Sequence, residues 1–210
     1  MSELVARTGR HQQRYEDGCR LVAGCIPFKY RNSVESNGAA SQKIVEVLMI
    51  NSTSGPGLLF PKGGWENDET VEEAALREAL EEAGVRRLKG FIIHVLFPTQ
   101  CDLRLRFSLA HERCYGFQHF LGCYLFKSKT LQDESCPEGL CKAAMFALLV
   151  KEELPSWPEQ STRERSWLTI PEAIERCRHP WMRKALEEGF SKWHDDHLKI
   201  NGKEEDIHIS

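Results

Sequence analysis

The sequence predicts an α+β domain. Short runs rich in valine, isoleucine and leucine recur between glycine, proline and polar residues, which is the pattern of strands separated by turns. A strongly helical segment lies between residues 70 and 84, and apolar side chains recur at helical spacing after residue 180. The chain has 210 residues, which suits one domain with a buried core.

The expected strands share aliphatic and β-branched residues between turn-forming residues. They cover residues 20–30, 44–51, 58–60, 121–127, 142–152 and 166–170. The expected loops between them cover residues 31–43, 52–57, 128–139 and 155–165. Two helices are expected near the C-terminus, over residues 171–178 and 180–197. In the last helix, the side chains that face the core on spacing are Trp181, Leu186, Phe190 and Trp193.

The helix that begins after Thr70 has both of its ends marked in the sequence. Thr70 and Glu73 have the spacing of a capping box, and Gly84 stands where a glycine ends a helix. At about 100° per residue, the larger apolar residues gather on one side, which we expect to pack into the core. These residues are Leu76, Ala79, Leu80 and Ala83.

The opposite side of this helix gathers Glu78, Glu81 and Glu82. Three carboxylates so close together repel one another unless a divalent cation neutralises them. A metal ion held in this way suits a substrate that is itself polyanionic, such as a pyrophosphate. The alternative interpretation of the helix alone is an ordinary solvated acidic face.

The residues upstream of the helix carry a family resemblance. Read from Gly63, the chain has five residues, then Glu69, then seven residues, then the run REALEEAGV from Arg77 to Val85. This spacing resembles the signature of the Nudix hydrolases at every fixed position, and Ala79 stands where a larger aliphatic residue is common. The resemblance implies a Nudix α/β/α sandwich around a mixed β-sheet, over residues 20–199.

The resemblance also implies roles for the signature residues. Glu78, Glu81 and Glu82 would bind Mg²⁺ or Mn²⁺, and a backbone carbonyl near Lys62 or Gly63 would add a ligand. Glu69 and Arg77 would support the carboxylates, Arg77 by bidentate hydrogen bonding. The implied reaction is hydrolysis of a phosphoanhydride bond by a water molecule whose pKa the metal lowers. The identity of the general base stays open.

The flanking segments narrow the resemblance to one branch. They look like the diphosphoinositol polyphosphate phosphohydrolases, and more closely like plant members of the Nudix hydrolase thirteen type. That branch is associated with diadenosine polyphosphates and diphosphoinositol polyphosphates. A substrate with many phosphates needs basic partners beyond the metal. The candidates are Arg20, Lys29, Arg31, Lys62, Lys142, Arg163 and Arg165. The alternative for each is an ordinary solvated charge.

One segment departs from the family pattern. Residues 90–120 form an apolar insert with five of the ten phenylalanines and two acidic residues. An apolar insert of this length needs a surface to cover it. It is either retained non-coding sequence in the gene or a capping element over the substrate cleft. Two other functions therefore stay open: a catalytically impaired Nudix-fold binding module, and a Nudix hydrolase of ADP-ribose or NADH-type substrates.

Composition sets the remaining expectations. The formal net charge of −3 offers no global basic field for nucleic acid, and the longest apolar run is too short to span a membrane. Eight cysteines without a C-x-x-C pair are expected to be reduced thiols in an intracellular protein of the cytoplasm, nucleus or mitochondrion. Residues 1–19 are expected to be a flexible lead-in and residues 200–210 a mobile tail. The sequence makes no prediction of oligomeric state.

Overall fold

The computed structural model describes residues 6–7, 12–32, 43–87, 119–128 and 138–197. A mixed β-sheet forms the middle of the domain, with strand order β10–β3–β2–β8–β7. These strands are β2 (Cys19–Asn32), β3 (Lys43–Asn51), β7 (His119–Lys127), β8 (Leu140–Leu149) and β10 (Arg165–Thr169). β2 and β8 run parallel, and the other neighbours in this order are antiparallel. The mixed sheet and the α+β class are therefore confirmed.

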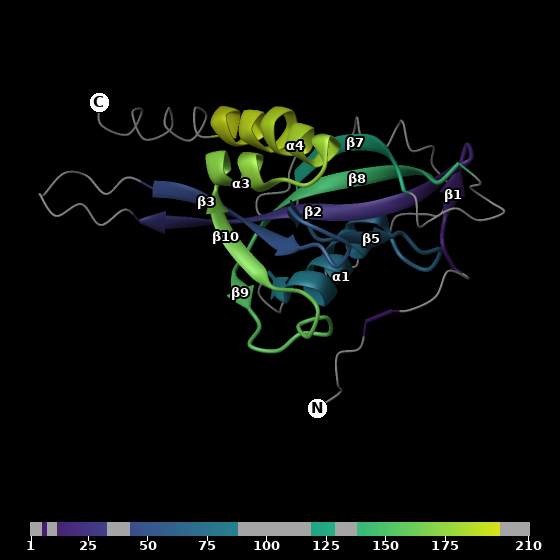
Figure 1. The fold of residues 1–210 in the computed structure, drawn as a ribbon, viewed down its shortest axis with the longest axis horizontal. Coiled ribbons are helices and arrows are strands. Elements are labelled where there is room, and N and C mark those ends of the chain that lie inside the picture. Colours follow the sequence, from purple (N-terminus) through teal and green to yellow (C-terminus); the bar gives the residue numbers. More distant parts are fainter. Residues whose placement is uncertain (1–5, 8–11, 33–42, 88–118, 129–137, 198–210) are drawn as a thin grey trace, which may run out of the picture.

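Helices cover both faces of this sheet (Figure 1). The helix α1 (Val71–Ala83) packs on one face, against β2. The other face is covered by α3 (Ile170–Arg176), α4 (Pro180–Lys184) and the π-helical segment η1 (Ala185–Ser191). The expected helix over residues 180–197 thus contains a π-helical segment in its middle. As the sequence predicts, Leu186 and Phe190 are fully buried and Trp193 packs against the core.

Three short strands extend this sheet around the segment that leads into α1: β1 (Tyr15–Glu16), β4 (Leu58–Leu59) and β5 (Lys62–Gly64). Two others, β6 (Val85–Arg86) and β9 (Glu152–Glu153), form a separate two-stranded sheet. The segment around Gly63 forms the strand β5, which pairs with β2. The strand expected over residues 142–152 ends at Leu149, and β9 instead pairs with β6. This break lets the chain pass from the sheet to the C-terminal end of α1.

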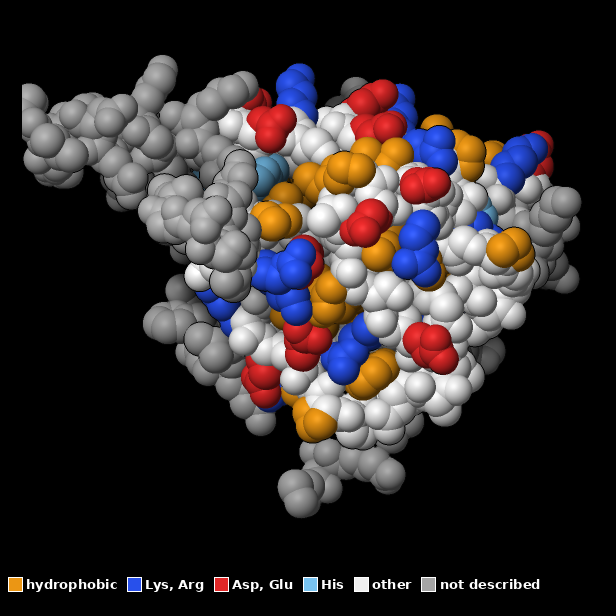
Figure 2. Space-filling view, turned by 60° about the vertical axis from the view of Figure 1, so that its left-hand side comes forward, with side chains coloured by type: hydrophobic (Ala, Val, Ile, Leu, Met, Phe, Trp, Pro, Cys, Tyr) orange, Lys and Arg blue, Asp and Glu red, His pale blue; other side chains and the backbone are white. Residues whose placement is uncertain are grey.

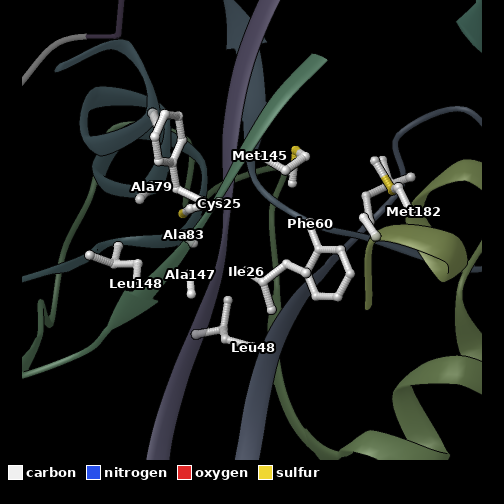
Figure 3. Close-up of a cluster of buried hydrophobic side chains, with 14 of the residues drawn as sticks. Cys25, Ile26, Leu48, Phe60, Ala79, Ala83, Met145, Ala147, Leu148 and Met182 are labelled. Atoms are coloured by element: carbon white, nitrogen blue, oxygen red, sulfur yellow. The ribbon is translucent and has the colours of Figure 1, made fainter. Parts of the chain in front are cut away.

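The core lies where the central strands meet the helices. Figure 3 shows Ala79 and Ala83 of α1 approaching the strands near Cys25, with Met182 of α4 on the side of Phe60. All five of these side chains are fully buried. Alanines in α1 allow its backbone to lie close to the sheet, since they occupy little space.

The face of α1 that packs inward matches the prediction at Ala79 and Ala83, which are fully buried, and differs from it at other positions. Leu76, expected in the core, is 37% exposed, whereas Ala74 and Ala75 are fully buried. The side chains of the three glutamates, expected on the outer face, are buried with 6–8% exposure. Apolar periodicity gave most weight to the leucines, but the close packing on β2 needs small residues, and the glutamates find polar partners inside the fold.

Part of the expected flexible lead-in is packed against the domain. Gln13 is buried, and its side-chain amide donates to the carbonyl oxygens of Leu21 (2.7 Å) and Trp65 (2.9 Å). The strand β1 pairs with the start of β2. Buried backbone carbonyls need donors, and Gln13 satisfies two of them, which explains why this segment is held in place.

Several expectations fall outside the described residues. The residues outside the described part include 33–42, 88–118, 129–137 and 198–210. Most of the insert over residues 90–120 and the whole C-terminal tail are therefore not described. Within the described part, no helix is long and apolar enough to cross a membrane. On the face shown in Figure 2, described basic and acidic side chains are interspersed, and neither sign forms a continuous patch.

Candidate active site

The helix α1 begins and ends as its sequence predicts. The Thr70 hydroxyl accepts from the Glu73 N–H at 3.2 Å, and the Glu73 carboxylate accepts from the Thr70 N–H at 2.8 Å. Gly84 takes the left-handed conformation with φ 60°, and its N–H donates to the Leu80 carbonyl. Both ends of α1 are therefore fixed, and with them the direction of the glutamates on its last two turns.

Gly63 is the point of closest approach between β5 and α1. A Cβ atom built on Gly63 would overlap the carboxylate of Glu78. A side chain at this position would therefore displace Glu78 from its hydrogen bond with Arg77. Because Gly63 pairs with Ala23 of β2, the central sheet sets the position of this contact.

Arg77 connects the signature residues to one another. Its guanidinium donates two hydrogen bonds to Glu69, at 2.8 and 3.0 Å, and one to the Gly64 carbonyl at 2.8 Å. It also donates to Oε1 of Glu78 at 2.6 Å and to Oε2 of Glu81 at 3.3 Å. A planar fork with five donors suits this bridging position, which a lysine cannot fill.

Glu82 has a different set of partners. The Lys62 N–H donates to its Oε2 at 2.7 Å, and Nη2 of Arg163 donates to its Oε1 at 2.7 Å. Glu81 accepts, in addition to Arg77, the backbone N–H of Arg7 at 3.3 Å. Glu81 and Glu82 are thus oriented in part by donors from segments distant in the sequence.

The cluster formed by Glu78, Glu81 and Glu82 is electrostatically crowded. Burial, and then the neighbouring Glu82 charge, raise the pKa of Glu78 to about 8, while Arg77 acts in the opposite direction. Burial is also the largest cause that raises the pKa values of Glu81 and Glu82. Arg77 partly offsets this effect at Glu81, and Lys62 and Arg163 partly offset it at Glu82. The neighbouring arginines do not fully compensate the negative charge of these carboxylates, so the cluster favours a bound cation.

The donor set fits a hard divalent cation. Among the described residues, no group of three His, Cys, Asp or Glu side chains is arranged to hold a metal ion as it stands. The oxygens of Glu78, Glu81 and Glu82 bond instead to arginines and backbone N–H groups. Oxygen ligands from several carboxylates are nevertheless what Mg²⁺ and Mn²⁺ prefer, and the repulsion within the cluster is relieved by such an ion.

Comparisons with known proteins agree with this geometry. A family model described as the NUDIX domain matches residues 38–189. Nudix hydrolase 16, mitochondrial, from Arabidopsis thaliana is 59% identical over 204 residues, which cover 97% of each chain. The chain belongs to the Nudix family. As a member of it, this Nudix hydrolase is a pyrophosphohydrolase.

Two further proteins resemble this Nudix hydrolase. Nudix hydrolase 13, mitochondrial, from Arabidopsis thaliana is 45% identical over 190 residues, which cover 90% of this chain and 82% of the relative. A mutT/nudix family protein from Listeria innocua has a similar crystal structure, with a TM-score of 0.50 and 17% identity over 88% of this chain and 99% of that one. The first supports the plant Nudix type, and the second supports the fold.

The structure of this Nudix hydrolase places the predicted phosphate-binding residues in different surroundings. Lys62 adjoins the carboxylate cluster through its N–H. Arg163 and Arg165 reach α1, where Arg163 binds Glu82 and Arg165 donates at 3.4 Å to the carbonyls of Ala83 and Gly84. Both arginines are therefore engaged with the protein.

The other four predicted basic residues lie outside the cluster. Arg20 donates to Gln13 at 2.7 Å, and Lys142 pairs with Glu16 at 2.7 Å. Lys29 pairs with Glu153 at 2.9 Å, and Arg31 pairs with Glu46 at 3.1 Å. Lys29 and Arg31 follow Gly24, the β2 partner of Lys62, by five and seven residues. At about 3.3 Å per residue, this puts them roughly 16 and 23 Å along the strand.

Sequence reasoning missed three residues that contact the cluster or its partners. Arg7 reaches Glu81, Asn51 accepts from Arg163 through its carbonyl, and Glu159 donates its N–H to the Glu81 carbonyl at 3.1 Å. None of them lies in the signature, and no spacing connects them to it. Only the folded chain brings them to the end of α1.

Proposed function

We propose that this Nudix hydrolase uses Mg²⁺ or Mn²⁺ to cleave phosphoanhydride bonds in diadenosine polyphosphates or diphosphoinositol polyphosphates. The observation that carries the proposal is the buried cluster of Glu78, Glu81 and Glu82 beside Gly63. Burying three neighbouring carboxylates costs folding free energy unless positive charge compensates them, so their presence favours a cation-binding role.

Each residue in and around the cluster has a separate role in the proposed reaction. Glu78, Glu81 and Glu82 would hold the divalent cation, which supplies charge neutralisation and an acidified water molecule when bound. Arg77 holds Glu78 and Glu81 in place and is itself held by Glu69. Once the cation is bound, a cluster carboxylate that is not fully used as a ligand can accept the proton of the attacking water. Lys62 adjoins the cluster through its backbone N–H, and its side chain is the proposed partner of a substrate phosphate group.

The proposed compartment is the mitochondrion. The two Arabidopsis relatives named above are described as mitochondrial, and together they cover nearly all of this chain. A fusion of the full chain to a fluorescent protein, imaged with a mitochondrial marker, tests this proposal. Exclusive signal in the cytoplasm or nucleus would contradict it.

The proposed activity is tested by following the products, which are two adenosine phosphates from diadenosine hexaphosphate and inorganic phosphate from a diphosphoinositol polyphosphate. Wild type is assayed with diadenosine hexaphosphate and with a diphosphoinositol polyphosphate, each with Mg²⁺ and with Mn²⁺. Turnover should require the metal and fall by at least about 100-fold in Glu81→Gln and in Glu82→Gln, because each change removes a ligand charge. The matched control is Glu138→Gln, which alters an exposed glutamate paired with Lys127.

Comparison substrates decide between substrate classes. ADP-ribose and NADH are assayed under the same conditions as the two proposed substrates. Faster metal-dependent turnover of ADP-ribose or NADH would contradict the proposed substrate class. It would still agree with metal-dependent hydrolysis of a phosphoanhydride bond. Turnover that persists in both glutamate variants would contradict the role of the cluster.

A further inference from the structure

Arg163 lies outside the Nudix signature, in the loop of residues 154–164 between β9 and β10. Its guanidinium uses all three nitrogens on protein atoms. Nη2 donates to Oε1 of Glu82 at 2.7 Å, Nη1 to the Asn51 carbonyl at 3.1 Å, and Nε to Oε2 of Glu159 at 3.2 Å. The side chain is only 14% exposed. This arginine therefore joins α1, the end of β3 and its own loop at one point.

Asn51 holds the backbone on both sides of Arg163. Its side-chain amide donates to the Thr162 carbonyl at 3.2 Å, and its side-chain oxygen accepts from the Glu164 N–H at 2.8 Å. The Asn51 N–H also donates to the Glu164 carbonyl at 3.3 Å. The position of Arg163 is consequently set by the last residue of a central strand, although Arg163 itself belongs to a loop.

The same loop contacts the last turn of α1 directly. The Glu159 N–H donates to the Glu81 carbonyl at 3.1 Å, and the Leu154 N–H donates to the Gly84 carbonyl at 2.8 Å. Carbonyls at a helix C-terminus have no partners within the helix, so these donors satisfy groups that would otherwise be orphaned. The loop and the end of α1 that carries Glu82 thus form one hydrogen-bonded unit.

The orientation of the Glu82 carboxylate depends on two donors. The Lys62 N–H is fixed by the strand β5 and holds Oε2, while Arg163 holds Oε1. Glu82 is 6% exposed, so solvent cannot replace a lost partner easily. Breaking a buried ion pair at one end leaves an uncompensated charge that reorients or draws in water.

We propose that Arg163 is a positioning residue that holds the Glu82 carboxylate in place for the divalent cation, and that Asn51 in turn positions Arg163. The proposal rests on the function proposed above. It replaces the expectation from sequence that Arg163 binds substrate phosphate, because its nitrogens are already used on Glu82, Asn51 and Glu159. Partners of this kind, which orient a ligand without touching the metal, control affinity in other metal sites.

Metal binding without substrate tests the proposal. Metal-free full-length protein is titrated with Mn²⁺, and free Mn²⁺ is followed by electron paramagnetic resonance, for wild type, Arg163→Gln, Arg163→Lys and Asn51→Ala. We expect the Kd for Mn²⁺ to rise by roughly 10- to 100-fold in Arg163→Gln, and by less in the other two. The lysine retains the charge but lacks the fork. The control is Arg86→Gln, which breaks a bidentate pair with Glu152 away from the cluster.

Kinetics separate positioning from substrate contact. At saturating Mn²⁺, Arg163→Gln should lower kcat and leave KM within about threefold, since a positioning residue acts through Glu82. In the double variant Glu82→Gln with Arg163→Gln, the loss of Mn²⁺ affinity should equal that of Glu82→Gln alone, because the arginine then has no charged ligand to hold.

Three results would overturn the proposal. A raised KM with unchanged kcat and Mn²⁺ affinity would make Arg163 a substrate contact. Mn²⁺ affinities equal to wild type in Arg163→Lys and Asn51→Ala would also overturn the proposal, even if Arg163→Gln fails to fold. Full additivity in the double variant would show that Arg163 does not act through Glu82. A wild type that neither binds Mn²⁺ nor hydrolyses any substrate would instead remove the proposed function itself, and the positioning proposal with it.

Discussion

The carboxylate of Glu78 occupies the place where any other residue at position 63 would put its side chain. A Cβ atom at position 63 would overlap the carboxylate oxygens of Glu78. The glycine of the signature is thus required by a contact across the fold between β5 and α1. Its role is to let the strand approach the first carboxylate of the cluster.

Replacing Gly63 by alanine should displace Glu78 and weaken the metal site. We expect at least a tenfold loss of Mn²⁺ affinity and a destabilisation of about 1–3 kcal/mol from overpacking. Isothermal titration with Mn²⁺ and urea unfolding measure the two effects. Gly18→Ala is a useful control, because Gly18 has φ +72° with open space around its Cβ. It should lose stability through backbone strain and keep its Mn²⁺ affinity.

The stability of the metal-free protein should fall as the pH rises from about 4.5 toward 8. The pKa of Glu78 is raised from 4.5 to about 8 in the fold, so over this range the native state keeps a proton that the unfolded chain has released. The stabilisation is complete below pH 4.5 and is lost as the pH passes through the folded pKa. Urea unfolding with a chelator present, at half-unit pH steps, measures it.

Glu78→Gln should flatten this pH dependence, because glutamine does not titrate. Excess Mg²⁺ in the wild type should flatten or reverse it, since the cation favours the ionised carboxylate. A slope in metal-free Glu78→Gln equal to that of the wild type would show that other groups carry the effect.

Arg165 should matter for stability more than for substrate binding. Its guanidinium stacks 4.0 Å from the centroid of the Trp157 ring, and a Cβ on Gly84 would meet that same ring at 2.8 Å. Arg165→Gln should cost about 0.5–2 kcal/mol through the lost cation–π contact and weakened bonds to the end of α1. Thermal unfolding measures this cost. A KM raised more than tenfold with unchanged stability would restore Arg165 as a phosphate contact.

Gln13 should be needed for the folded domain although it lies near the N-terminus. Gln13→Ala leaves the carbonyls of Leu21 and Trp65 without this donor, which should cost about 1–3 kcal/mol. The matched control is Gln160→Ala, where an exposed amide donates to the Ser156 hydroxyl. Equal melting temperatures of the two variants would contradict a structural role for residues 12–16.

The sequence alone predicted much of the local structure. The capping box of Thr70 and Glu73 and the stop at Gly84 depend on contacts within a few residues, so they can be read from spacing. The same holds for the grouping of Glu78, Glu81 and Glu82 on neighbouring turns of one helix. The α+β class followed from the order of strands and helices.

Only the tertiary structure decided which way that helix faces. Periodicity placed Leu76 inside and the glutamates outside, but alanines of α1 are buried in the core, and the buried glutamates accept hydrogen bonds from arginines and backbone N–H groups. Glu82 accepts hydrogen bonds from the Lys62 N–H and from the side chain of Arg163, which is 81 residues away in the sequence. Such pairings depend on how the sheet brings distant loops together, and no local spacing encodes them. The sequence therefore determined the chemistry of the cluster, and the fold decided which residues orient it.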